Sequence, residues 1–204
     1  MKIDPSDLDW REAHHLMVGV VVPRPIALVS TISADGIHNL AAFSCFTPMC
    51  HKPTLIGFSV ATRRDGSRKD TINNIKATGE FVVAAVAEEL GEKMNQASSS
   101  YPPEIDEFQE CSLTPVKAEL VKTPMVGEAP VNIECRLHQV LEFGEPSRQT
   151  HFVIGKVLLV HVKDEIYADG QIQVPELKTI ARLGGDYYCR TRDLFIMDRT
   201  YVVE

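Results

Sequence analysis

Short stretches that alternate apolar and polar residues, or that are continuously apolar, dominate the chain. Seven segments fit β-strands on this basis, namely 26–33, 37–43, 54–60, 81–87, 131–143, 151–162 and 194–203. Asp35-Gly36 lies between the first two and is typical of a tight hairpin turn, so these two strands should pair antiparallel. In segment 131–143 the alternation breaks near residues 139–141, which predicts a β-bulge there.

Two short helices are predicted from their terminal residues. The first covers residues 8–17 and follows Ser6-x-x-Asp9, which resembles a capping box. The second is capped by Asp70 or Thr71 and stops at Gly79, a residue type that favours helix ends.

Two further helices are predicted closer to the C-terminus. Residues 88–97 suit a short helix that the sequence SSSYPP ends. Residues 176–183 suit another, with Gly184-Gly185 as its C-cap.

The elements together predict a mainly β protein, an antiparallel Greek-key barrel with short peripheral helices. A doubly wound parallel sheet fits poorly, because no Gly-x-Gly-x-x-Gly follows a predicted strand and long helices do not alternate with the strands. A length of 204 residues favours a single domain over 1–204.

Charge and apolar run length exclude several functions. Lys and Arg total 21 and Asp and Glu total 28, a net charge of −7 that argues against nucleic-acid binding but permits a local anion site. The longest apolar runs, 16–22 and 81–87, are far shorter than the roughly 20 residues that span a bilayer. The first residues, MKIDPSDLDW, contain no apolar signal core, so we expect neither secretion nor membrane insertion.

The cysteines and histidines give no sign of a disulfide framework or a metal centre. The five cysteines are odd in number and form no Cys-x-x-Cys pair, which favours reduced thiols in a cytoplasmic protein. Cys45 and Cys50 are expected to be buried and inert. The seven histidines make no zinc motif, so no metal site is predicted.

The second arm of the predicted hairpin is unusually small and polar, which suggests that a ligand occupies the place of bulky side chains. A phosphate site needs hydroxyls, backbone N–H groups and usually a cation. Lys69 supplies a charge, the first turn of the helix after it supplies N–H groups, and hydroxyls come from Ser30, Thr31, Ser44 and Thr71. Asp70 would repel a phosphate, so its role is either the helix cap or a contact to a ligand hydroxyl or ring N–H. Hydroxyls at strand ends and capped helices also occur in proteins without such a site, so the pattern permits phosphate binding without requiring it.

Several motifs in order resemble the flavin reductase-like family of FMN-binding split β-barrels, with flavoredoxin-like proteins as the closest subgroup. The resemblance covers roughly residues 20–197. Its motifs are PRPIALVST, NLAAFS, KDT before TGEFVV, EKMNQASSSYPPEIDEF, APVNIECRL, HFVIGKV and ARLGGDYY. Two departures are Ala42, where the family often has proline, and Ala84-Ala85, where an asparagine is common, so any side-chain role there is in doubt.

The resemblance implies FMN held without a covalent bond at a homodimer interface. The isoalloxazine and ribityl chain would lie along Thr31, Asn39, Phe43 and Ser44, and the phosphate would be held by Ser44, Lys69 and Thr71. Ala41 and Ala42 would let a flat ligand approach the backbone, and Arg182 would approach the flavin or a nicotinamide. Since hydride passes from nicotinamide to flavin without a protein acid or base, no catalytic acid or base is assigned.

Two classes of function remain open at this point. One is an NAD(P)H-dependent flavin reductase that delivers reduced FMN to a partner oxygenase. The other is a non-catalytic, flavoredoxin-like carrier of electrons between proteins. A third reading is an FMN-binding homologue whose electron donor is not a nicotinamide.

Overall fold

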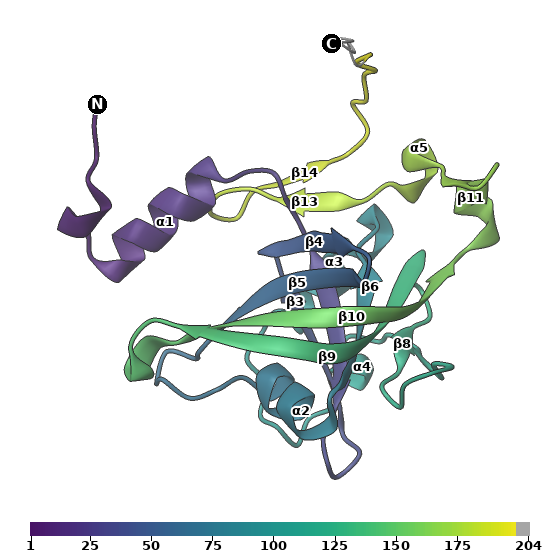
Figure 1. The fold of residues 1–204 in the computed structure, drawn as a ribbon, viewed down its shortest axis with the longest axis horizontal. Coiled ribbons are helices and arrows are strands. Elements are labelled where there is room, and N and C mark those ends of the chain that lie inside the picture. The colour runs from purple at the N-terminus through teal and green to yellow at the C-terminus, as the bar shows by residue number, and fades with distance from the viewer. Residues whose placement is uncertain (199–204) are drawn as a thin grey trace.

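A seven-stranded antiparallel sheet forms the body of the protein, as Figure 1 shows. The computed structural model describes residues 1–198. The strand order is β3-β2-β6-β9-β10-β5-β4, so β3 and β4 are the edge strands. These strands are β2 (Ala27–Ile32), β3 (His38–Phe43), β4 (Phe46–His51), β5 (Thr54–Ala61), β6 (Glu80–Ala85), β9 (Val131–Phe143) and β10 (Thr150–Val162).

The register confirms the predicted hairpin and shows a bulge on β9 just before the predicted position. Strands β2 and β3 pair antiparallel, with Ser30 opposite Leu40. In the pairing of β9 with β10 the register shifts at His138, just before the predicted residues 139–141. A second shift occurs at Leu158 on β10.

The helices lie in the connections between strands and at the N-terminus. They are α1 (Trp10–Val20), α2 (Asp70–Thr78), α3 (Gly91–Ala97), α4 (Glu107–Glu110) and α5 (Val174–Leu177), with 3₁₀ turns η1 (Pro5–Asp7), η2 (Glu88–Leu90), η3 (Pro146–Arg148) and η4 (Asp164–Ile166). The capping box of α1 is formed by Asp9 and Glu12, not by Ser6 and Asp9 as predicted. Gly79 ends α2 with φ 72°, a left-handed conformation that glycine adopts without strain.

A small sheet beside α1 replaces the helix predicted over 176–183. Only Glu176 and Leu177 of that segment are helical, in α5, and the chain then forms β13 (Ile180–Arg182). Strand β13 pairs with β1 (Arg24–Pro25) and β14 (Tyr188–Arg190), so Gly184-Gly185 lies in a hairpin turn and is not a helix C-cap. The predicted strand 194–203 is wrong over 194–198, which form no strand, and its remainder lies outside the described residues. The remaining short strands are β7 (Pro115–Val116), β8 (Met125–Val126), β11 (Tyr167–Ala168) and β12 (Gln171–Ile172).

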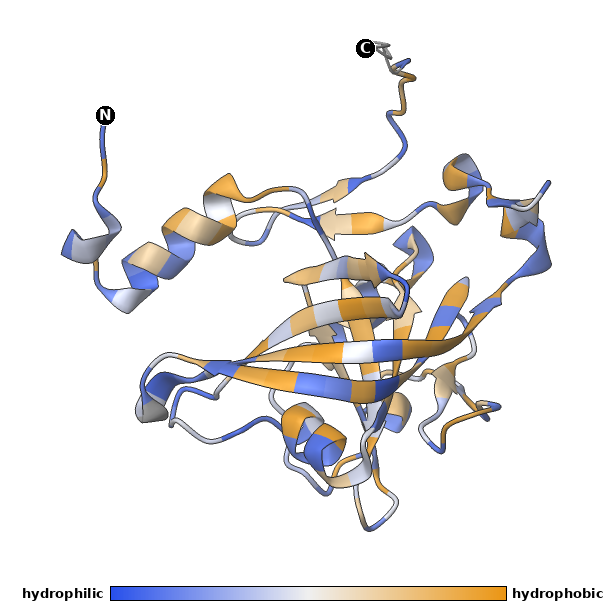
Figure 2. Ribbon diagram, in the orientation of Figure 1, coloured by the Kyte–Doolittle hydropathy of each residue, from blue (hydrophilic) through white to orange (hydrophobic). Residues whose placement is uncertain are grey.

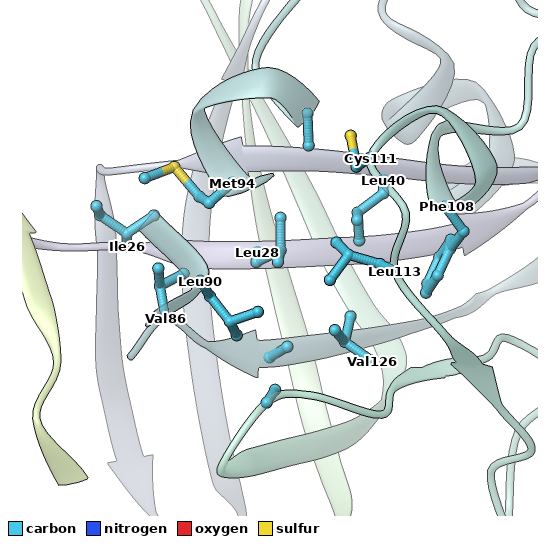
Figure 3. Packing of buried hydrophobic residues seen from close by; sticks show 13 residues of the cluster. Ile26, Leu28, Leu40, Val86, Leu90, Met94, Phe108, Cys111, Leu113 and Val126 are labelled. Atoms are coloured by element: carbon cyan, nitrogen blue, oxygen red, sulfur yellow. The ribbon is translucent and has the colours of Figure 1, made fainter. Parts of the chain in front are cut away.

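Two apolar cores lie on opposite faces of β2 and β3. Since neighbouring residues of a strand point to opposite faces, Leu28 and Leu40 pack towards α3 and α4, and Val29 packs towards α2. Figure 3 shows the first core, with Met94 of α3 and Phe108 of α4 beside Leu28 and Leu40. In Figure 2 the long strands β9 and β10 carry both orange, hydrophobic segments and blue, hydrophilic ones. In the described part of the chain, no helix has the length and apolar character needed to span a membrane.

Candidate functional site

Helix α2 begins beside the free edge of β3, and its first turn is not capped by a side chain. Its N-cap residue is Lys69, so neither Asp70 nor Thr71 is the cap that the sequence predicted. Asp70 instead forms an ion pair with Arg63, with 2.5 Å between Oδ2 and Nη2. Because the first N–H groups of a helix have no partner within the helix, those of Asp70 and Thr71 are free to bind a ligand. The positive end of the helix dipole favours an anion there.

A cavity opens at this point and runs along the edge of β3; we call it the Lys69 cavity. Helix α2 contacts β3 from one face, and α3 and α4 contact it from the other. The lining therefore comes from β3, the start of α2, the segment after α3, and α4: Asn39, Leu40, Ala41, Ala42, Arg63, Lys69, Asp70, Thr71, Ala97, Ser98, Ser99, Ser100, Tyr101 and Glu107. Six of the residues predicted from the sequence are among them, namely Asn39, Ala41, Ala42, Lys69, Asp70 and Thr71.

Two cations, Arg63 and Lys69, line this cavity, but they differ in their partners. Arg63 is already neutralised by Asp70. Lys69 has no carboxylate partner among residues 1–198, and its Nζ lies 5.5 Å from the centroid of the Phe43 ring. Burial lowers the pKa of the Lys69 ammonium, and the nearby charge of Arg63 adds to the effect. An anion bound in the cavity would offset both the burial of the Lys69 charge and its repulsion by Arg63, so the electrostatics favour a negatively charged ligand.

Glu107 is a lining residue that the sequence analysis missed. Its side chain is 6% exposed, and its Oε2 accepts a hydrogen bond from the backbone N–H of Leu40 at 3.2 Å. Burial raises the pKa of this carboxyl to about 7, and the charges of Asp70 and Asp106 also act against its ionisation. The sequence does signal α4, because Asp106 is a good N-cap residue and caps that helix. It gives no sign that α4 packs against β3.

Thr31 and Asn39 hold α2 against the sheet. The Oγ1 of Thr31 accepts a hydrogen bond from Nδ2 of Asn74 at 3.0 Å, beneath the helix. The Nδ2 of Asn39 donates to Oγ1 of Thr71 at 3.3 Å, at the edge of the cavity. Thr31 is fully buried and does not line the Lys69 cavity, so any influence it has on a ligand passes through α2.

Ser30 and Phe43 also lie away from the cavity lining. Ser30 points to the opposite face of β2 from Thr31, where its hydroxyl donates to the carbonyl of Pro124. Phe43 is buried in the core beside Phe58, with 5.3 Å between ring centroids. Because Lys69 lies over the Phe43 ring, Phe43 is beneath the cavity.

Ser44 and Arg182 lie near the other end of β3, around Arg24. Arg24 is 7% exposed and donates to the carbonyls of Val18 and Leu183 and, at 3.4 Å, to the hydroxyl of Ser44. Arg182 lies opposite Arg24 in the β1–β13 pairing, and its guanidinium lies over the Tyr188 ring, 4.6 Å from the centroid. Apart from Ser30, Thr31 and Phe43, the predicted residues therefore form two groups, one at the Lys69 cavity and one around Arg24.

The free edge of β3 connects these two groups. The N–H of Leu40 bonds to Glu107 and not to β2, so it faces the open edge. Orientation alternates along an antiparallel strand, so the N–H and carbonyl of Ala42 face the same edge. The small side chains of Ala41 and Ala42 leave this backbone accessible.

Two of the cysteines, and the side chains that could bind a metal ion, are the remaining reactive groups. Cys45 is exposed and Cys50 is partly exposed, so neither is buried as the sequence suggested. Within residues 1–198, no group of three His, Cys, Asp or Glu side chains is arranged to hold a metal ion.

The fold and the site define a mainly β split-barrel protein with a cavity on an edge strand, lined by Lys69 and the start of α2. The model of the flavin reductase like domain matches residues 18–176, more than half of the chain. The protein therefore belongs to the flavin reductase-like family, as its motifs suggested.

Three solved structures support this assignment. Nitrilotriacetate monooxygenase component B from Bacillus cereus is 33% identical, with a TM-score of 0.93 over 97% of this chain and 98% of the other. A putative flavin reductase with a split barrel domain from Shewanella frigidimarina is 24% identical, with a TM-score of 0.83 over 98% and 100%. Flavoredoxin of Desulfovibrio vulgaris is 24% identical, with a TM-score of 0.73 over 87% and 91%. The last two likenesses show the shared fold alone.

Proposed function

We propose that the protein is a cytoplasmic FMN-binding flavin reductase that uses NAD(P)H and works as a homodimer of single-domain chains. The observation that carries the proposal is the Lys69 cavity, where the free N-terminus of α2 meets a lysine that has no carboxylate partner among residues 1–198, at the open edge of β3. Family membership supports a flavin as the ligand.

The Lys69 cavity fits the phosphate end of FMN. Lys69 and the N–H groups of Asp70 and Thr71 supply the charge and donors that a phosphate monoester needs. The Thr71 hydroxyl adds a further donor, since Asn39 uses its oxygen only as an acceptor. Asp70 is paired with Arg63, and this ion pair offsets the repulsion between its carboxylate and the phosphate.

The rest of FMN would extend along β3 from the cavity towards Ser44. The backbone of Ala42 offers an amide and a carbonyl at this edge, which suits the polar rim of an isoalloxazine. Phe43 would support Lys69 from beneath through the contact between its ring and the ammonium group. Ser44 and Arg182 would lie near the isoalloxazine end of FMN. Ser30 and Thr31 would support β2 and α2 without touching the ligand.

Bound FMN would supply the hydride-accepting ring, and the chain would bind and orient it. In this binding mode, backbone N–H groups along β3 and the cations Arg24 and Arg182 would stabilise negative charge on the ring. No side chain needs to act as acid or base in this scheme.

An oxygenase partner is part of this proposal. The structure with a TM-score of 0.93 is named as a component of a monooxygenase, which supports delivery of reduced flavin to a second protein. The alternative of a flavoredoxin-like electron carrier rests on a likeness at 24% identity, which supports the fold but not the activity. Both alternatives predict FMN binding, so the electron donor distinguishes them.

An anaerobic spectroscopic titration tests the proposal. The purified protein, supplied with FMN, should show bound oxidised flavin, and added NADH or NADPH should bleach its visible absorbance in repeated turnovers with excess free FMN. Flavin that binds but is bleached by neither nicotinamide would support the carrier. A protein that takes up no FMN would reject both functions.

A further inference from the structure

Glu107 stands out in the Lys69 cavity because a carboxyl group is an unexpected neighbour for a bound phosphate. One of its oxygens accepts the N–H of Leu40 at 3.2 Å. The carboxyl lines the cavity although the residue is more than nine-tenths buried. The proposed mode of FMN binding does not use this group.

The charged groups around Glu107 are mixed in sign and largely paired with one another. On the α2 side, Asp70 is held by Arg63, which leaves Lys69 as the cation available to a ligand. On α4 itself, Asp106 lies 3.3 Å from Nδ1 of His38 on β3, and Glu110 is exposed one turn further on. The remaining titratable group in the lining is Tyr101, from the segment after α3.

A bound phosphate would change the ionisation of Glu107. Two anions in one cavity repel each other, so the ligand's charge favours the protonated carboxyl. The burial that raises the pKa of Glu107 to about 7 means that little free energy is needed to add a proton near neutral pH. Once protonated, the carboxyl has one O–H donor to offer the ligand, and its Oε2 can still accept from the N–H of Leu40.

We propose that Glu107 takes up a proton when a phosphate monoester binds in the Lys69 cavity and donates that proton in a hydrogen bond to the phosphate. This inference rests on the proposed binding of FMN and assigns a recognition role to a residue outside the KDT motif. Its consequence is that FMN affinity falls as the pH rises above neutrality, because ionised Glu107 repels the ligand and offers it no donor.

Fluorescence titrations with FMN and riboflavin at pH 7.0 and 8.5 test the inference, since phosphate monoesters are already dianions in this range, with a second pKa of about 6. In the wild type, FMN should bind about tenfold more weakly at pH 8.5, as expected when binding is linked to uptake of one proton. Riboflavin, which lacks the phosphate, should change less than about twofold over the same range.

Two variants separate the effect of Glu107 from that of Lys69, whose pKa is also lowered by burial. In Glu107→Gln the amide oxygen can accept from Leu40 and the NH₂ can donate at any pH, so FMN affinity should be nearly constant. Glu110→Gln, on the exposed side of the same helix, should keep the wild-type dependence. Calorimetry of FMN binding to the wild type, in buffers of different ionisation enthalpy, should show net proton uptake at pH 7.0. This measurement needs no variant, so it does not depend on whether a variant folds.

The outcomes are distinct. An unchanged pH dependence in Glu107→Gln, or no proton uptake by the wild type, would overturn this inference and leave FMN binding intact. Failure of FMN to bind at either pH would overturn the proposed function and this inference with it.

Discussion

At the scale of single residues, the position of a side chain on its strand decides what it can do. Ser30 and Thr31 are adjacent, so they point to opposite faces of β2 and serve different cores. The same alternation, applied to the sequence, predicts that Ser30 and Thr31 cannot both face one ligand. Lys69 and Thr71 could be predicted together because both lie at the start of one helix, whereas Glu107 could not, since its place depends on packing between segments distant in the chain.

Gly155 on β10 illustrates how closely the core is packed at one residue. A Cβ there would collide with the ring of Phe81, which is fully buried and packs edge-on against Phe58 with 5.6 Å between centroids. We predict that Gly155→Ala lowers the free energy of unfolding by about 1–3 kcal/mol, the usual cost of overpacking. Urea denaturation measures this.

A matched glycine provides the control for that prediction. Gly19 is an exposed residue of α1, and a Cβ there would meet nothing within 4 Å. Gly19→Ala should leave stability unchanged or raise it by up to about 1 kcal/mol, because alanine favours helices. An equal loss of stability in both variants would show that the Phe81 contact is not the cause.

At the scale of elements, segments with regular patterns were predicted and segments shaped by tertiary pairing were not. The helix ending at Gly79 and the long strands β9 and β10 follow directly from periodicity and cap residues. The sequence of β4, FTPMCH, contains a proline and no clear alternation, so it was missed. Residues 180–182 belong to the helix predicted over 176–183 but form a strand, because β1 and β14 supply hydrogen-bonding partners on both sides.

The loop between β7 and β8 is held by one buried carboxylate, Glu134 of β9. It accepts the N–H groups of Glu119, Leu120 and Val121 at 2.7–3.1 Å and contacts Nε2 of His161 at 2.6 Å. Burial alone would raise the pKa of Glu134, but these hydrogen bonds outweigh it and hold the pKa below its usual value of 4.5. A carboxyl with a lowered folded-state pKa stabilises the protein above its unfolded pKa, and the stabilisation is lost as the pH falls through the folded value.

We therefore predict a pH-dependent loss of stability in Glu134→Gln. At pH 7 the variant should be less stable by about 2 kcal/mol, the range for hydrogen bonds to a charged group. The difference from the wild type should shrink as the pH falls from 4.5 through the lower folded-state pKa of Glu134, because the wild-type side chain then loses the charge that the amide lacks. Urea denaturation across this range is the measurement. Glu119→Gln, an exposed side chain in the same loop, should match the wild type, and a difference that does not vary with pH would contradict the assigned role.

At the scale of the whole molecule, the mainly β class follows from strand periodicity, but the strand order does not. The sequence contains no local signal that β6 lies between β2 and β9, since these pairings join segments far apart in the chain. The strand pattern predicted a mainly β Greek-key barrel, and the family resemblance added that the barrel is split.

The distribution of exposed apolar residues supports the proposed homodimer. Helix α1 lies beside the β13–β14 hairpin and apart from the main sheet, as Figure 1 shows. It exposes Met17 (51%) and Val20 (64%), which continue into exposed Val21 and Val22. A monomer would leave this patch in water, and a second copy of the chain could cover it.

We predict that light scattering gives twice the chain mass of 22.7 kDa. Val20→Asp should shift the protein towards the monomer, because a charge would be buried in the interface. Val116→Asp, at an exposed apolar site on β7, should remain dimeric. A wild-type protein with the mass of one chain and with flavin bound would contradict the dimer.

The central claim is that the Lys69 cavity holds the phosphate of FMN, and a comparison of FMN with riboflavin at pH 7.0 tests it most directly. The wild type should bind FMN more tightly than riboflavin. Lys69→Ala should weaken FMN binding by about 1.5–3 kcal/mol, the range for a hydrogen bond to a charged group, and leave riboflavin binding unchanged. Lys117→Ala, at an exposed position, should behave as the wild type. Equal affinities for the two flavins in the wild type, or FMN affinity unaltered in Lys69→Ala, would contradict the account.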